Sequence, residues 1–510
     1  MPPDVGLSPL FRRAARVGCT GARRRLHPPG VAADPAPWAV AGAAAGEDDG
    51  RATPDPTQDP TEDSRRTREE VSVKKQRPAP PRKEDMRPES LMMSFGYRPE
   101  WSEGAVKPPV FLTSTFVFGN AREAKEAFAQ AYGLPGPLPK GPPHLIYSRL
   151  GNPDLEILEA RLDLWDRAAA SAVFASGMAA ISTSLLALVP MGSSIVFARP
   201  VYGGTDYLLD VILPEMGIPT RDFPAGSEPA VVEELMAQLA ARGSPCKLVF
   251  FETPANPTTT LTDIADMAEL AHRHGALCVV DNTLLGPLYQ QPLCHGADLV
   301  VYSATKYLGG HSDLVAGVAL GSAELIERVK LFRTIFGTML DPHSAWLLLR
   351  SLETAKLRMT CARKNAERIA DWLFAHPRVS RVYFPGRLES RHQRRIYRRQ
   401  CSGPGALMAF DLADAGEAEA YRLLDSVRLI KLAVSLGGTE SLIEHPATMT
   451  HADVPENEQA ALGITPAMIR LSVGIEHPDD LIADLSWALD QVDAADPEVA
   501  TVGREEAPGR

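Results

Sequence analysis

The stretch DLVVYSATKYLGG (residues 298–310) joins an apolar run to two hydroxyl groups, a lysine and two glycines. The continuous apolar run predicts a strand that is covered on both faces of its sheet. Lys306 follows this strand, where a buried ammonium is costly unless it is paired, neutral or covalently bound. The first interpretation of Lys306 is an exposed residue in the turn after the strand, because lysines are mostly exposed. The second is a Schiff-base lysine. The third is the lysine of a serine acyl-transferase, because residues 303–306 fit the S-x-x-K pattern.

Similar apolar runs occur on both sides of this stretch and alternate with helical patterns. Helical periodicity occurs in between, for example over 177–189 and 263–275, where Asp263 is a predicted N-cap and Gly275 a predicted C-terminal glycine. This alternation predicts an α/β fold with a mostly parallel sheet covered on both faces. The further predicted strands are SAVFA (171–175), SIVFA (194–198), KLVFFE (247–252), LCVVD (277–281) and VAGVAL (315–320).

The pattern changes after about residue 340. Residues 344–377 form one long run with apolar positions at helical spacing, and short apolar runs such as GALMAFDLA (405–413) follow. We therefore expect a smaller α+β domain in the C-terminal part of the chain.

Composition limits the function classes. The chain has 510 residues and a formal net charge of -11, which argues against general nucleic-acid binding. No apolar run approaches the roughly 18 residues that a membrane span requires. The six cysteines are scattered without a C-x-x-C pair or metal-ligand spacing, so we expect a reduced, cytoplasmic protein.

Residues 1–85 differ from the rest of the chain. They are rich in Pro, Gly and charged residues and poor in large apolar ones, so we expect a disordered tail. The first thirty residues are arginine-rich and acid-poor, which faintly resembles an organelle transit peptide. A passive tail and a translation start at Met86 are the alternatives.

Polar groups follow three of the predicted strands. Ser176, Gly177 and Met178 begin a helix after the first strand, and the free N–H groups of a helix start attract an anion. Asp281 ends another strand, where it is either a turn or N-cap residue or the partner of a cation such as a protonated pyridine nitrogen.

The third group is Ser303 and Thr305, whose hydroxyls could bind a phosphate beside Lys306. The carboxyl ends of parallel strands meet at one edge of the sheet, where ligands bind. A phosphate site, an acid for a ring nitrogen and a Schiff-base lysine together are what pyridoxal phosphate requires. The acyl-transferase interpretation is weaker, because a K-T-G motif is absent and Ser303 leaves a strand rather than a helix.

Eight motifs occur in order along the chain: YSRLGNP (147–153), FASGMAAI (174–181), VYGGT (201–205), ETPANP (252–257), VVDNT (279–283), YSATKYLGGHSD (302–313), SLGGTESLIEHPATMTH (435–451) and IRLSVGIEHPDDL (469–481). Together they resemble the trans-sulfuration (Cys/Met metabolism) family of pyridoxal-phosphate enzymes. The resemblance runs from about Pro88 to about Val492. It implies a fold-type I architecture, with a seven-stranded, mostly parallel sheet domain, a smaller α+β domain and a homotetramer.

With this resemblance, the chain divides into five segments. We expect disordered tails at 1–85 and 496–510, and an arm at 86–150 that contributes to the active site of the neighbouring subunit. The cofactor-binding α/β domain is expected at 151–343 and the C-terminal α+β domain at 344–495.

The resemblance also implies a role for each matching residue. Lys306 would bind the cofactor covalently, Asp281 would pair with its ring nitrogen, and Tyr202 would stack on its ring and help move protons. The phosphate would be held by Ser176, Gly177, Met178, Ser303 and Thr305, with Tyr147 and Arg149 reaching the site of the neighbouring subunit. Asn256 would lie near the ring oxygen and the substrate, whose α-carboxylate would be bound by Arg470 with Ser435.

The reaction expected from this resemblance takes place at the γ-carbon of a sulfur amino acid or an activated homoserine. Gly204 stands where methionine γ-lyases carry a cysteine, which favours the cystathionine enzymes. Val434 stands where cystathionine enzymes usually carry a glutamate, which favours methionine-type or sulfhydrylase-type relatives. We expect a cystathionine γ-synthase, cystathionine γ-lyase or methionine γ-lyase. The alternatives are an O-acylhomoserine sulfhydrylase and a catalytically silent binding protein.

Overall fold

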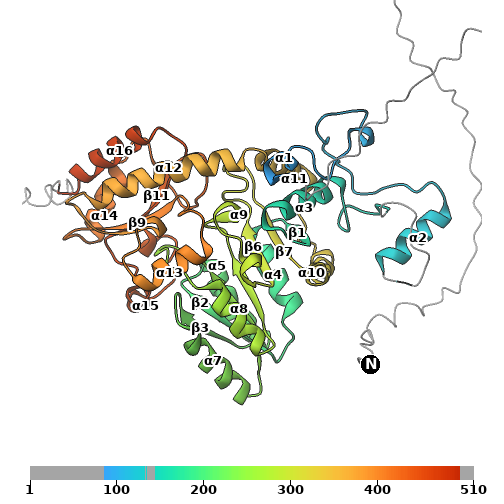
Figure 1. The fold of residues 1–510 in the computed structure, drawn as a ribbon, viewed down its shortest axis with the longest axis horizontal. Coiled ribbons are helices and arrows are strands. Elements are labelled where there is room, and N and C mark those ends of the chain that lie inside the picture. Colours follow the sequence, from blue (N-terminus) through green and yellow to red (C-terminus); the bar gives the residue numbers. More distant parts are fainter. Residues whose placement is uncertain (1–85, 133, 135–143, 494–510) are drawn as a thin grey trace, which may run out of the picture. The chain divides into compact units, whose positions relative to one another are not determined.

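The computed structural model describes residues 86–132, 134 and 144–493. The predicted disordered tails at 1–85 and 496–510 lie outside the described residues. The larger sheet has seven strands in the order β1-β7-β6-β5-β4-β2-β3, and all are parallel except β7, which runs antiparallel to both neighbours. These strands are β1 (Ala170–Phe174), β2 (Ser194–Arg199), β3 (Thr220–Pro224), β4 (Cys246–Glu252), β5 (Leu277–Asp281), β6 (Leu299–Ser303) and β7 (Gly317–Gly321) (Figure 1).

Helices cover both faces of this sheet, which explains why its strands are continuous apolar runs. The helices between residues 88 and 352 are α1 (Pro88–Leu91), α2 (Ala121–Ala131), α3 (Pro153–Asp166), α4 (Gly177–Leu188), α5 (Gly203–Tyr207), α6 (Leu213–Glu215), α7 (Pro229–Ala241), α8 (Ile264–Arg273), α9 (Gly286–Tyr289), α10 (Ala323–Phe336) and α11 (Pro342–Leu352). In β6, Leu299 and Val301 pack with α4 and α10, whereas Val300 and Tyr302 pack with α3 and α11.

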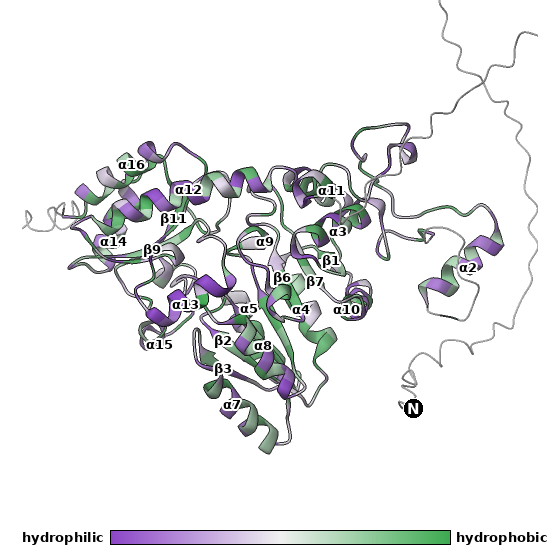
Figure 2. Cartoon of the chain, in the orientation of Figure 1, coloured by the Kyte–Doolittle hydropathy of each residue, from purple (hydrophilic) through white to green (hydrophobic). Residues whose placement is uncertain are grey.

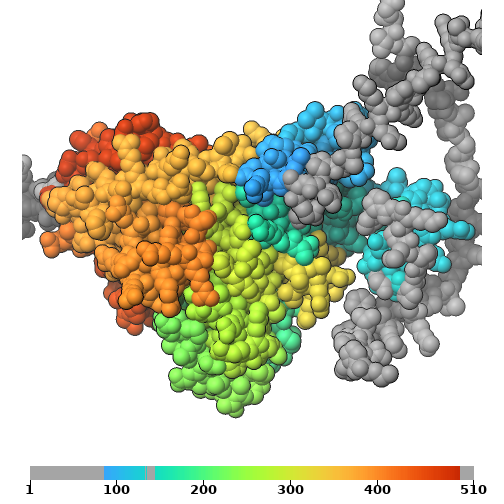
Figure 3. Space-filling model, in the orientation of Figure 1, coloured from blue at the N-terminus to red at the C-terminus, as the bar shows by residue number. Residues whose placement is uncertain are grey.

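A second sheet has the order β10-β11-β12-β9-β8 and lies in the C-terminal part of the chain. Its strands pack against helices in a separate apolar core, and this lobe appears in orange and red in Figure 3. The elements are α12 (Ala355–Phe374), β8 (Val379–Tyr383), α13 (Arg391–Gln400), β9 (Leu407–Leu412), α14 (Glu417–Ser426), β10 (Lys431–Leu432), β11 (Leu442–Glu444), α15 (Glu456–Ala461), β12 (Met468–Ser472) and α16 (Pro478–Asp490).

The predicted α/β class is confirmed, and so is the position of the six predicted strands within one or two residues. Asp263 caps α8 as predicted, because its side chain accepts a hydrogen bond from the Asp266 N–H group. Two details of the sequence interpretation were wrong. Strand β3 was missed, because it is an edge strand in which three of the five residues are exposed and only Thr220 and Phe223 are buried.

The second error concerns the single helix predicted over 344–377, which is two helices. Thr354 leaves the helical conformation between α11 and α12, and the preceding Glu353 forms ion pairs with Lys107 and Arg161.

Within the described residues, we find no helix that combines the length and apolar character needed to cross a membrane.

Candidate active site

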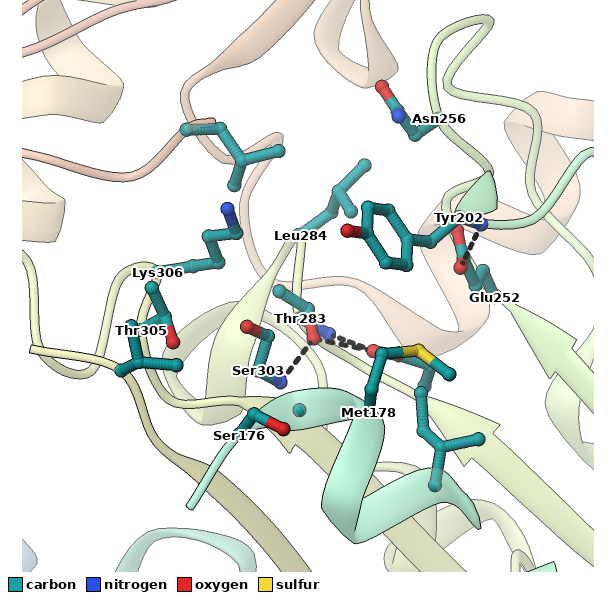
Figure 4. A pocket seen from close by; sticks show the side chains of 15 residues that line it. Ser176, Met178, Tyr202, Glu252, Asn256, Thr283, Leu284, Ser303, Thr305 and Lys306 are labelled. Atoms are coloured by element: carbon teal, nitrogen blue, oxygen red, sulfur yellow. Dashed lines mark hydrogen bonds between the residues drawn. The ribbon is translucent and has the colours of Figure 1, made fainter. Parts of the chain in front are cut away.

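A pocket of about 230 Å³ lies at the carboxyl ends of the larger sheet. Strands β4, β5 and β6 end at this pocket, helix α4 begins there, and the segment before β11 closes one side. Figure 4 shows Lys306 and Tyr202 on different sides of the pocket, with Ser176 and Ser303 beside the start of α4. The lining residues are Ser176, Gly177, Met178, Ile181, Tyr202, Glu252, Asn256, Asp281, Thr283, Leu284, Ser303, Thr305, Lys306, Val315 and Leu436.

The start of α4 forms a polar cradle on one side of the pocket. Ser176 is the N-cap, and its hydroxyl accepts a hydrogen bond from the Ala179 N–H group at 3.0 Å. A Cβ atom on Gly177 would lie 2.9 Å from the Ser303 Cβ, so a side chain does not fit there without a shift. Thr305 is held by the residue that precedes β7, because its Oγ1 accepts a hydrogen bond from the Ala316 N–H group at 3.0 Å. This close packing of α4 against the end of β6 brings donors for an anion together.

Asp281 lies buried at the end of β5. Its Oδ1 accepts hydrogen bonds from the Thr283 N–H group at 2.9 Å and from the Thr283 hydroxyl at 2.5 Å. Burial raises the pKa of Asp281, and the two hydrogen bonds from Thr283 oppose this shift. A cation bound to Asp281 would favour its ionised form.

Glu252 is a pocket residue that the sequence interpretation missed. It ends β4 directly beside Asp281, and its carboxylate accepts a hydrogen bond from the Tyr202 N–H group at 2.6 Å. Burial and the neighbouring Asp281 charge both raise the pKa of Glu252. The sequence contained one signal for Glu252, because this acidic residue ends an apolar strand just as Asp281 does. Glu252 therefore holds the backbone that carries Tyr202, whose ring faces the pocket (Figure 4).

Lys306 lies across the pocket and is only partly exposed. Its Nζ donates a hydrogen bond to the Ser435 Oγ at 2.7 Å. Burial and the nearby Arg470 charge lower the pKa of Lys306 to about 8. A larger fraction of this amine is therefore neutral, and nucleophilic, near pH 7 than in an exposed lysine.

Arg470 is 3% exposed and lies behind Ser435. Its guanidinium donates to the Ser435 backbone oxygen at 2.7 Å and to the Asn256 Oδ1 at 3.3 Å. It also forms an ion pair with Glu444 at 2.7 Å, and this partner is fully buried. Glu444 was missed from the sequence, although it faces Arg470 across the β11–β12 pair. Ser435 has a φ of 90°, which is an unusual conformation for a residue other than glycine.

Three predicted residues lie outside the pocket of their own chain. Tyr147 and Val434 are exposed, by 41% and 55%. The guanidinium of Arg149 donates to the Thr334 backbone oxygen at 2.8 Å, near the end of α10. The single chain therefore brings the other predicted residues together in or directly behind one pocket, whereas Tyr147 and Val434 are exposed and Arg149 is half-buried against α10.

The chemistry of this donor set fits pyridoxal phosphate. The start of α4 and the hydroxyls of Ser303 and Thr305 suit a phosphate, and Asp281 suits a protonated ring nitrogen. Lys306, the residue after Thr305, lines the same pocket and is an amine with a lowered pKa, which suits the aldehyde. The phosphate, the ring nitrogen and the aldehyde of the cofactor thus each have a matching protein group.

Comparisons with known proteins agree with this assignment. A model of the family described as "Cys/Met metabolism PLP-dependent enzyme" matches residues 89–490. The L-methionine gamma-lyase of Pseudomonas putida is 39% identical over 396 residues, which cover 77% of this chain and 95% of that protein. The O-succinylhomoserine sulfhydrylase of Mycobacterium tuberculosis is 40% identical over 385 residues, covering 74% of this chain and 90% of that protein.

Solved structures give the same result. The crystal structure of cystathionine gamma-lyase from Lactobacillus plantarum, complexed with L-serine, aligns with a TM-score of 0.72 and 34% identity. The alignment covers 80% of this chain and all of that chain. The protein therefore belongs to the Cys/Met metabolism family of pyridoxal-phosphate-dependent enzymes.

Proposed function

We propose that the protein is a γ-lyase that cleaves the carbon–sulfur bond of a sulfur amino acid with an apolar side chain, of the methionine type. The observation that carries this proposal is that the acidic side chains around the pocket already contact other groups of the protein. Among the described residues, Glu444 is paired with Arg470, and Glu252 accepts a hydrogen bond from the Tyr202 backbone. Asp281 is the acid that suits the ring nitrogen. The pairing of Glu444 with Arg470, and the raised pKa of Glu252, which favours its neutral form, argue against either group binding a second ammonium group such as the distal one of cystathionine.

The distal part of the substrate would meet apolar side chains. Met178, Leu284, Val315 and Leu436 line the pocket. Val434 lies next to Ser435, at the position where an acidic side chain would contact a distal ammonium. An apolar wall favours a thioether over a charged group, because a charge there would lose its hydration without gaining a partner.

The roles of the residues follow from this geometry. Arg470 and the backbone near Ser435 would bind the substrate α-carboxylate, and Asn256 would fix the guanidinium that makes this contact. Pyridoxal phosphate, when bound, supplies an electron sink that makes the substrate Cα acidic. Lys306 would then take the proton from Cα, since its Nζ has a lowered pKa and can act as a base near neutral pH.

Tyr202 would complete the reaction on the other side of the ring. Its backbone is held by Glu252, so its ring would stay in the pocket and would exclude water from the cofactor. Its hydroxyl would donate a proton to the sulfur that leaves the γ-carbon. A second proton would be lost from Cβ when the thiol leaves Cγ, and one water would then be consumed in the hydrolysis that releases ammonia. The products would be a thiol, a 2-oxo acid and ammonia.

A substrate panel tests the proposal. The holoenzyme would be offered methionine, cystathionine, and O-acylhomoserine with sulfide or cysteine, and the products identified by mass spectrometry. We expect methionine to give a thiol and a 2-oxo acid with a kcat/KM at least tenfold above that for cystathionine. A preference for cystathionine would contradict the argument from the paired carboxylates.

The second candidate is an O-acylhomoserine sulfhydrylase. The similarity to an O-succinylhomoserine sulfhydrylase, at 40% identity, favours it. A small thiol or sulfide needs no charged distal subsite either. The panel separates the two functions, because only the sulfhydrylase forms a new carbon–sulfur bond when sulfide is present.

We also propose that the active site is shared between two copies of the chain in a cytoplasmic homotetramer. The N-terminal arm exposes apolar side chains to an unusual degree, for example Val117 at 96% and Leu112 at 73%, which a second copy would cover. Tyr147 and Arg149 lie on this arm and would reach the phosphate site of the neighbouring subunit. The five cysteines of the described residues are free thiols, which suits a reducing compartment.

The Arg149→Ala variant tests the shared site. We expect its affinity for pyridoxal phosphate to fall by about tenfold or more, because a charged hydrogen bond to the phosphate contributes about 1.5–3 kcal/mol. Cofactor loss during dialysis would be followed by absorbance. The exposed Arg328 is the matched control, and its replacement by alanine should leave cofactor affinity unchanged. Equal affinities of Arg149→Ala and Arg328→Ala for pyridoxal phosphate would contradict the proposal that Arg149 binds the phosphate in the neighbouring subunit.

The lowered pKa of Lys306 gives a pH prediction for the cofactor-free protein. Only the neutral amine can bond to an aldehyde, so rebinding of pyridoxal phosphate should speed up about tenfold per pH unit below pH 8 and level off above it. A lysine with the ordinary pKa of 10.5 would show a rate that still rises beyond pH 9. Stopped-flow absorbance at several pH values distinguishes these profiles.

A further inference from the structure

Helix α13 carries the strongest local concentration of positive charge among the described residues, in a chain with a net charge of -11. Its sequence, RHQRRIYRRQ, has five arginines and no acidic residue. The two sides of this helix differ: Gln393, Ile396 and Gln400 face the protein, whereas Arg391, Arg394, Arg395 and Arg398 are exposed. Figure 2 shows α13 as one of the most hydrophilic helices in the view.

The exposed arginines line an open groove of about 620 Å³. Across this groove lies Glu228, just before α7, and it is 3.3 Å from His392. Of the α13 arginines, Arg399 is neutralised by Asp263 and Asp266. In the part of the chain that the structure describes, Arg391, Arg395 and Arg398 form no ion pair. The groove therefore gathers like charges that a bound anion would stabilise.

The spacing of these arginines indicates the shape of the anion. Positions 391, 394, 395 and 398 fall on one face of the helix over two turns, and the first and last are separated by about 10 Å along its axis. A single phosphate cannot reach both ends of this row, but a chain of two or three phosphates can. Guanidinium groups bind phosphate oxygens in pairs of parallel hydrogen bonds, which makes arginine well suited to such a ligand.

The inner face of α13 leads to the active site. Gln393 binds both backbone groups of Leu261, accepting from its N–H group at 2.7 Å and donating to its oxygen at 2.8 Å. Gln400 accepts a hydrogen bond from the Ile264 N–H group at 3.1 Å. The segment held in this way begins with Asn256, whose side chain accepts a hydrogen bond from Arg470. A ligand that orders α13 would therefore also order the segment that fixes the substrate-binding arginine.

We propose that the groove formed by Arg391, Arg394, Arg395 and Arg398 is an effector site for a small anion with two or more linked phosphates. The site is separate from the pocket that holds the cofactor, and its effect on turnover rests on the function proposed above. The ligand is an inorganic polyphosphate or a nucleoside polyphosphate. In both, the linked phosphates make the contacts.

Isothermal titration calorimetry on the holoenzyme tests binding without any need for turnover. Inorganic tripolyphosphate, ATP and orthophosphate are titrated in turn, against the wild type and the R395A/R398A double variant. The double variant R242A/R328A is the matched control, because both arginines are exposed, and Arg242 follows the end of α7 while Arg328 lies on α10. We expect saturable tripolyphosphate binding that weakens with salt, a loss of at least tenfold in R395A/R398A and less than twofold in the control.

The class of ligand is decided by comparing tripolyphosphate with ATP, and then with two polyanions, a DNA duplex and a poly-glutamate peptide. ATP binding more tightly than tripolyphosphate would identify a nucleoside polyphosphate, and equal affinities would identify the phosphate chain alone. Tripolyphosphate binding that is absent, or equal in the wild type and R395A/R398A, would overturn the site. Tighter binding of a DNA duplex or of a poly-glutamate peptide would overturn the assignment to a small phosphate ligand.

The effect on the active site has a separate readout. With saturating tripolyphosphate, we expect the KM for the best substrate of the panel to change at least twofold in the wild type and to stay constant in R395A/R398A. A KM that does not respond in the wild type would overturn the coupling through Gln393 and Gln400. Failure of the substrate proposal leaves the calorimetric result unaffected, so the two failures are distinguishable.

Discussion

The Lys306→Ala variant should lose turnover by about 10³-fold or more, since it removes both the covalent link to the cofactor and the base that takes the substrate proton. The structure gives two reasons to expect such a large loss of turnover. The Lys306 amine lies in the pocket with a pKa lowered to about 8. No other lysine is among the residues that line this pocket. Turnover is measured by the release of 2-oxo acid from the best substrate.

The control for this prediction is the Lys306→Arg variant. It keeps a positive charge near Ser435, but a guanidinium neither bonds to an aldehyde nor loses its proton near neutral pH. We expect it to be as inactive as Lys306→Ala. Its thermal midpoint should stay close to that of the wild-type protein without cofactor. Activity above one-tenth of the wild type in either variant would contradict the role of Lys306.

The second large effect is expected at the buried pair of Arg470 and Glu444. Removing the guanidinium in Arg470→Ala leaves Glu444 fully buried without its counter-charge. Loss of one partner of a buried ion pair costs about 3–5 kcal/mol. We therefore expect a clear fall in the thermal midpoint. The KM should also rise by about tenfold to a hundredfold, because a charged hydrogen bond to the substrate carboxylate is lost.

A double variant separates the stability effect from the binding effect. In Arg470→Met with Glu444→Gln, both charges are absent and no buried charge is left unpaired. We expect most of the lost stability to return, while the KM stays high. A double variant that is as unstable as Arg470→Ala would show that the cost does not come from the unpaired carboxylate. A KM that returns to the wild-type value would show that Arg470 does not bind the substrate.

The sequence predicted those parts of the fold and site that depend on local patterns. Continuous apolar runs identified six strands, and the polar residues after them, such as Asp281 and Lys306, do meet at one edge of the sheet. Strand β3 was missed because an exposed edge strand has no continuous apolar run. The break at Thr354 was missed because the apolar periodicity continues across it.

The missing site residues have a different cause, since their partners are distant in sequence. Glu444 is recognisable as the partner of Arg470 only once β11 and β12 are paired in register. Glu252 reaches the Tyr202 N–H group across 50 residues. The arginine face of α13 becomes one side of a groove only where Glu228, the residue before α7, lies next to it. Such contacts depend on tertiary packing, which a single sequence does not reveal.

Peptide mapping after borohydride reduction tests most directly whether Lys306 carries the cofactor. Freshly purified holoenzyme is reduced, digested and analysed by mass spectrometry, which locates the lysine to which pyridoxal phosphate has become permanently bound. We predict that the added mass lies on the peptide containing SATKY, at Lys306, with one cofactor per chain. An unmodified Lys306, or the added mass on another lysine, would contradict the assignment of this pocket as the active site.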